Sequence, residues 1–97
     1  MPEYLVELYV SRTGAGGLRQ SVETARRAAE ELSRQGTPVS QLRFIFVPED
    51  ETCLLLYEAV SAEAVQEVAR RAELCFERLS AVVDSGELVR EAKGDPR

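Results

Sequence analysis

The stretch Val39–Ala59 reads VSQLRFIFV-PEDE-TCLLLYEA, two apolar runs separated by a short polar linker. Branched and aromatic side chains favour strands, and a proline-led polar linker is typical of a turn. We therefore expect strands over Val39–Val47 and Thr52–Ala59 that form an antiparallel hairpin. With the linker as the loop, the expected pairs are Val47 with Thr52, Phe46 with Cys53, Ile45 with Leu54, Phe44 with Leu55, Arg43 with Leu56 and Leu42 with Tyr57.

Helical patterns flank this hairpin along the chain. The first is expected from about Gly17 to Arg34, where Gly36 and Pro38 would stop it. The second is expected to begin at Ser61, a good N-cap, and to end near Glu73. The apolar stripes at helical spacing are Leu18, Val22, Ala25, Ala29 and Leu32 in the first helix, and Ala62, Val65, Val68, Ala69 and Ala72 in the second.

A strand is expected at each end of this series. Glu3–Val10 alternates with the period of a strand, and Leu79–Val83 follows the second helix. The order strand, helix, strand, strand, helix, strand predicts an α+β, ferredoxin-like βαββαβ sandwich, with both helices on one face of an antiparallel four-stranded sheet. We assign one domain to residues 1–90 and a loose tail to 91–97, with Leu88 and Val89 available for a further short strand or for docking on a neighbour.

Composition narrows the classes of function. The chain has 97 residues, 44% of them hydrophobic and 30% charged, which is typical of one globular domain. A net charge of −5 disfavours nucleic acid and anionic membranes as partners. The start of the chain has no targeting pattern, so we expect a cytoplasmic protein with two reduced thiols, Cys53 and Cys75. There is no histidine, the commonest general base and metal ligand, and we expect neither cofactor nor metal site.

Both faces of the predicted sheet are apolar, whereas the helices can cover only one. A carboxylate under the helices would be costly, so Glu7 is expected on the open face with Leu5 and Tyr9. Slim aliphatic side chains suit close packing under alanine-rich helices. We therefore predict that Ile45, Val47, Leu54 and Leu56 face the helices, and that Phe44, Phe46, Leu55 and Tyr57 lie on the open face beside Glu7.

An exposed aromatic face of this kind favours a homodimer with a dimeric α/β-barrel-like arrangement, sheet against sheet. The candidate ligand-binding residues are Glu7, Tyr9, Phe44, Phe46, Leu55 and Tyr57. The favoured function is a binding module for a small apolar molecule or a protein partner. The alternative is a small cofactor-free enzyme acting on an apolar substrate, with Glu7 as a base whose pKa is raised by burial. The plainer role for Glu7, which we favour over catalysis, is an interface hydrogen bond or ion pair in the dimer, with Arg43 as one candidate partner.

The loop Thr13–Gly17 is a second segment of the kind that can bind a ligand. It joins a strand to a helix and is flanked by Arg12 and Arg19, as phosphate-binding loops often are. Its glycines match neither the dinucleotide fingerprint nor the Walker pattern. We therefore expect a plain connector.

Several segments together resemble a known group of proteins. They are Met1–Glu7 (MPEYLVE), Val47–Asp50 (VPED), Cys53–Ala59, Ser61 and Phe76–Leu79. This pattern, spanning about Met1 to Val83, resembles a family of small ferredoxin-like proteins of unknown function, one branch of which binds nickel. The resemblance implies a homodimer and, in some members, a metal site with a histidine in the second strand. Here that position is Phe44, so metal binding is not carried over; it would need ligands from the termini or from Cys53 and Cys75.

Overall fold

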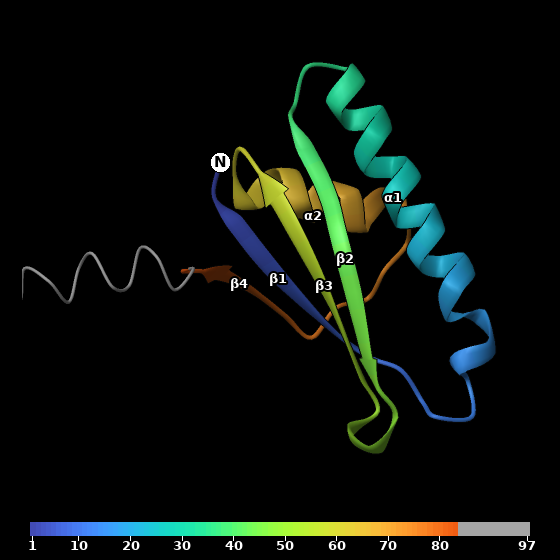
Figure 1. The fold of residues 1–97 in the computed structure, drawn as a ribbon. Helices are drawn as coiled ribbons and strands as arrows, with labels where there is room; N and C mark the ends of the chain where they lie inside the picture. The colour runs from blue at the N-terminus through green and yellow to red at the C-terminus, as the bar shows by residue number, and fades with distance from the viewer. Residues whose placement is uncertain (84–97) are drawn as a thin grey trace, which may run out of the picture.

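The computed structural model describes residues 1–83. The tail assigned to residues 91–97, and the strand or docking segment suggested at Leu88 and Val89, lie outside the described residues. The elements are β1 (Glu3–Tyr9), η1 (Ala15–Gly17), α1 (Leu18–Arg34), β2 (Val39–Val47), η2 (Pro48–Asp50), β3 (Thr52–Ala59), α2 (Ala62–Arg71) and β4 (Arg78–Val82). The strands form one antiparallel sheet in the order β2-β3-β1-β4, and α1 and α2 pack on one side of it (Figure 1). The predicted βαββαβ ferredoxin-like fold is confirmed.

The helix ends follow the signals in the sequence. At the end of α1, Gly36 has a φ of 103°, and the amide of Thr37 donates to the carbonyl of Leu32 over 3.1 Å. At the start of α2, the Ser61 hydroxyl accepts a hydrogen bond from the amide of Ala64 over 3.2 Å. Local capping chemistry therefore fixes both boundaries close to where the sequence predicts them.

The hairpin register is confirmed from the Arg43–Leu56 pair to the Val47–Thr52 pair. Beyond Arg43 the strand bulges, so that Gln41 instead of Leu42 pairs with Tyr57, and the expected Leu42–Tyr57 pair is wrong. Hydrogen bonding gives the reason. The Tyr57 hydroxyl donates to Gln41 Oε1 over 2.6 Å, and Gln41 Nε2 donates to the Val22 carbonyl over 3.1 Å. The bulge thus supplies a partner for a buried hydroxyl.

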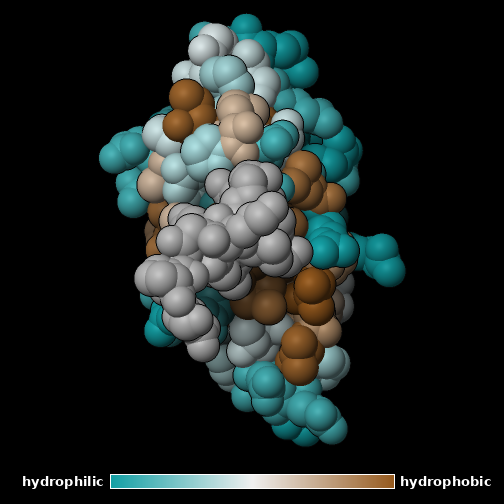
Figure 2. Space-filling model, turned by 60° about the vertical axis from the view of Figure 1, so that its left-hand side comes forward, coloured by the Kyte–Doolittle hydropathy of each residue, from teal (hydrophilic) through white to brown (hydrophobic). Residues whose placement is uncertain are grey.

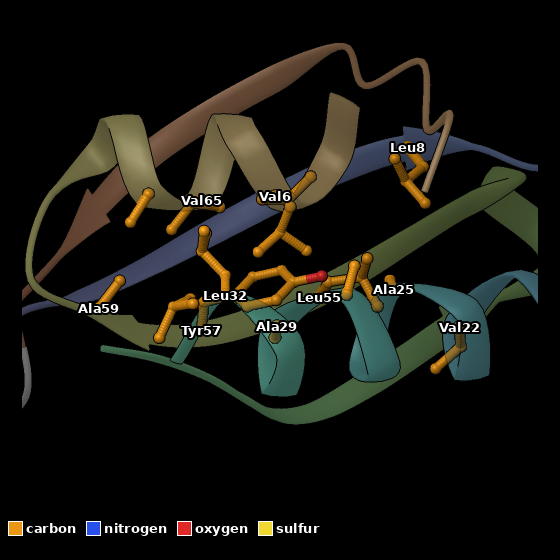
Figure 3. Close-up of a cluster of buried hydrophobic side chains, with 14 of the residues drawn as sticks. Val6, Leu8, Val22, Ala25, Ala29, Leu32, Leu55, Tyr57, Ala59 and Val65 are labelled. Carbon is orange, nitrogen blue, oxygen red and sulfur yellow. The ribbon is translucent and has the colours of Figure 1, made fainter. Parts of the chain in front are cut away.

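The core lies between the sheet and the two helices (Figure 3). Leu55 and Tyr57 of β3 are almost completely buried there, against the small side chains of Ala25 and Ala29 in the same cluster. Large side chains on the sheet fill the space that alanines leave on a helix, so packing density is kept. The prediction that slim aliphatic side chains pack under the alanines is therefore wrong.

This packing corrects the predicted faces of the hairpin. Phe44, Phe46, Leu55 and Tyr57 lie on the helix side, not on the open face. The residues on the open face are Ile45, Val47, Leu54 and Leu56, which had been placed under the helices. The physical reason is the register of β1 against β3, which pairs Val6 with Leu55 and Glu7 with Leu54. The side chains of directly paired residues lie on the same face of a sheet, so Leu54 lies on the open face with Glu7.

The assignment of faces can be checked with the two thiols. Cys53 is completely buried on the helix side, where burial raises its thiol pKa, whereas Cys75 is exposed. We expect Ellman's reagent to label one thiol per chain rapidly in the native protein and two in denaturant. Cys75→Ser should remove the rapid phase. Rapid labelling of both thiols in the native protein would contradict this assignment.

The role of the bulge in pairing Gln41 with Tyr57 can be tested by removing the Tyr57 hydroxyl. We expect Tyr57→Phe to lower the free energy of unfolding by about 1–3 kcal/mol, because Gln41 Oε1 then loses its buried donor. Urea unfolding measures the change. Tyr9→Phe is the matched control, since Tyr9 is 60% exposed, and its effect should stay within about 0.5 kcal/mol. Equal effects of the two substitutions would contradict the proposed role of Gln41.

Candidate functional site

The surface that the helices do not cover is built from the outward side chains of all four strands, and we call it the open face. At its centre, β3 and β1 contribute Leu54, Leu56 and Leu5, and β2 contributes Ile45. We call these four residues the apolar patch. Ile45 is 48% exposed and the leucines are partly exposed. Figure 2 shows hydrophobic side chains gathered on the side of the molecule away from α1. The expectation of an apolar open face therefore holds, with different residues.

Glu7 lies at the border of the apolar patch, on β1. It pairs with Leu54 on one side and with Arg78 of β4 on the other. The Arg78 guanidinium Nε is 4.0 Å from Glu7 Oε1, and the Glu7 side chain is 41% exposed. Arg43, the partner suggested from the sequence, is on β2 at the opposite edge of the sheet. Within one chain, Glu7 is thus the acidic member of an ion pair with Arg78.

Tyr9 continues the open face toward the β2–β3 hairpin. Its hydroxyl donates to Glu51 Oε1 over 3.4 Å, and the same carboxylate accepts a hydrogen bond from the amide of Arg12 over 3.2 Å. A recess of about 220 Å³ lies here, and its lining residues are Glu7, Leu8, Tyr9, Glu51, Thr52 and Glu77. Glu7 and Tyr9 therefore share one hollow at the edge of the apolar patch.

The other four candidate residues are separated from this hollow by the sheet itself. Phe44, Phe46, Leu55 and Tyr57 pack into the core, where burial raises the pKa of the Tyr57 hydroxyl. The predicted site of six residues is therefore divided between the two faces. The apolar patch is the part of the candidate site that the sequence does not predict. No local signal separates the two apolar sets of the hairpin, and only pairing with β1 distinguishes them.

The nickel site that the sequence resemblance implies for some family members has no counterpart among the described residues. Phe44, which the sequence resemblance aligns with the histidine ligand, packs against the core. Within residues 1–83, no three carboxylate, thiol or imidazole side chains lie close enough together to hold a metal ion. Cys53 is buried, and Cys75 is exposed. A transition metal generally needs several such donors together.

The glycine-rich loop borders a hollow of about 470 Å³ between the start of α1 and the turn before β4. Its lining combines apolar side chains such as Leu18 and Leu74 with Ser11 and Ser21. Arg12 and Arg19 are not part of the lining, and the Arg12 guanidinium donates to the Glu49 carbonyl over 3.4 Å. Among residues 1–83, the lining of this hollow therefore lacks the cations that a phosphate would need.

Neither helix in the described part of the chain combines the length and the apolar character needed to cross a membrane.

Comparison with known proteins finds a solved structure with a similar fold. No protein-family model matches the chain, and no curated protein matches it. The chain is similar to the crystal structure of SCO4226 from Streptomyces coelicolor A3(2), with a TM-score of 0.69 and 25% sequence identity. The match covers 86% of this chain and 98% of that chain. The protein is thus a small ferredoxin-like domain that resembles SCO4226 over nearly its whole length.

Proposed function

We propose that the protein is a homodimeric binding module, in which two copies pack open face against open face and hold a small apolar molecule between them. The observation that carries this proposal is the apolar patch, which no described part of the chain covers. Sheets stack face to face at about 10 Å through side chains of this kind. A twofold dimer uses the same surface on both copies, so one apolar patch is sufficient.

Burial of the apolar patch alone brings the gain and the cost of dimerisation close to balance. Leu5, Ile45, Leu54 and Leu56 are partly exposed, and removing each from water contributes about 1 kcal/mol, half of the value for complete burial. Together, the contributions of both copies equal a cost in the lower part of the range for association. That range is about 4–15 kcal/mol, for lost translational and rotational freedom. The charges around the patch accordingly decide whether the dimer is stable.

The chemistry of the ligand follows from the edge of the patch. Aliphatic side chains offer no hydrogen bonds, so the body of the ligand is apolar. Glu7 and Tyr9 supply a carboxylate and a hydroxyl in the adjoining recess, which suits one polar group that donates a hydrogen bond. A largely apolar site with a few polar groups is the usual form of a small-molecule pocket.

The described contacts of Glu7 do not support the enzymatic alternative, in which Glu7 acts as a base. Its carboxylate lies beside the Arg78 guanidinium and is partly open to water. This is the geometry of a surface ion pair, not of a carboxylate isolated in an apolar pocket.

We also propose that the chain belongs to the small ferredoxin-like family that its sequence resembles, as a member without the metal site. The segments that carry the resemblance support this, as does the likeness to SCO4226. Phe44 in place of the histidine ligand marks the difference.

The dimer is tested by adding a charge to the apolar patch. We expect the wild-type chain to sediment at twice its mass of 10.8 kDa at micromolar concentration, and Ile45→Glu to shift it to monomer. The reason is that a carboxylate would be buried without a partner. Sedimentation equilibrium measures both. Gln66→Glu is the matched control, because it adds the same charge to the exposed side of α2 and should leave the dimer intact. A wild-type monomer at these concentrations would refute the dimer.

The apolar ligand is tested with a neutral solvatochromic dye, Nile red. We expect the wild-type dimer to bind it with a blue-shifted emission, and Leu56→Trp to weaken binding at least about tenfold by filling the space between the sheets. Sedimentation should show that this variant stays dimeric. If the wild-type dimer leaves the emission unchanged, the ligand proposal fails while the dimer stands.

A further inference from the structure

The open face carries two carboxylates that have no cationic partner among the described residues. Glu3 of β1 and Glu58 of β3 are direct cross-strand partners, and each is two residues along its strand from a leucine of the apolar patch, Leu5 or Leu56. Like charges directly opposite each other destabilise a sheet. Among residues 1–83, no cationic nitrogen lies within 4.0 Å of either carboxylate.

Arg43 is the complementary charge on the same face. It is exposed on the edge strand β2, where it pairs with Leu56 at the border of the apolar patch. In the described part of the chain, no carboxylate oxygen lies within 4.0 Å of its guanidinium. The other arginine of the open face, Arg78, already faces Glu7.

A second copy on this face would take these border charges partly out of water. A charge buried without a partner is strongly unfavourable, so a stable interface must bring Arg43 to a carboxylate. In a twofold interface each contact occurs twice, once in each direction. We propose that Arg43 of each copy pairs with Glu58, and with the adjoining Glu3, of the other copy. This inference rests on the proposed dimer and deepens it, because each copy then completes the charge balance of its partner.

A pairing within one chain is the competing arrangement. Glu58 is two residues from Leu56 on β3, so it is the diagonal neighbour of Arg43 across the strands. Diagonal neighbours are within reach of long side chains. In the single copy, Arg43 and Glu58 do not form an ion pair within 4.0 Å. The experiment must therefore distinguish pairing within one chain from pairing between the two copies.

Charge reversal in two separate chains does this. We expect Arg43→Glu and Glu58→Arg each to weaken dimerisation at least about tenfold, because like charges then meet across the interface. Mixing the two variants should restore dimers that contain one chain of each. In such a heterodimer, the reversed charge at position 43 faces the reversed charge at position 58, and the second contact is wild type. Native mass spectrometry, with one chain isotopically labelled, measures the mixed species.

The controls reverse charges on the helix layer, with Arg19→Glu and Glu63→Arg. Both positions are exposed and should leave the dimer unchanged. Circular dichroism checks that every variant is folded. If Glu58→Arg does not fold, the neutral variants Arg43→Gln and Glu58→Gln replace the reversals, and each should weaken the dimer.

The outcomes separate this inference from the dimer itself. If both reversals, or both neutral variants, dimerise as the wild type does, the inference is overturned and the dimer stands. If the mixture stays monomeric while the double variant Arg43→Glu/Glu58→Arg recovers the dimer, the pair forms within one chain and the inference is likewise overturned. A wild-type monomer would remove both proposals together.

Discussion

The pairing of β1 with β3, the two central strands, is the constraint on which the rest of the structure depends. Val6 faces Leu55 and Leu8 faces Cys53, so these pairs lie together under the helices. The same register leaves Glu7 beside Leu54 on the other side. A slip of one residue would send a carboxylate into the core or turn the large side chains of β3 into water. The cost of either outcome holds the sheet in one register.

Size complementarity then completes the core. The alanines of α1 allow the helix to approach the sheet, and Tyr57 and Leu55 fill the space in front of them. Burying a tyrosine requires a partner for its hydroxyl, which Gln41 supplies from the bulge in β2. The irregularity of an edge strand is thus a consequence of a large polar-tipped side chain in the core.

The open face of the sheet carries the side chains that the helices do not cover. Aliphatic side chains occupy its centre, Glu7 and Arg78 balance each other at one border, and Glu3, Glu58 and Arg43 remain at the other. An apolar centre inside a ring of charges is the usual composition of a protein interface. The proposed dimer and its reciprocal ion pairs use all of these groups, which is why assembly and ligand binding are proposed for the same surface.

The order of the elements, the hairpin register from Arg43 to Val47, the helix caps and the open position of Glu7 could be read from the sequence alone. These depend on periodicity, turn chemistry and capping, which act between neighbours along the chain. Only the tertiary structure decided which apolar set of the hairpin meets the helices, and that Gln41 replaces Leu42 opposite Tyr57. Both outcomes depend on contacts between distant segments, β1 with β3 and β2 with α1, and two apolar sets of similar hydrophobicity carry no local signal that separates them.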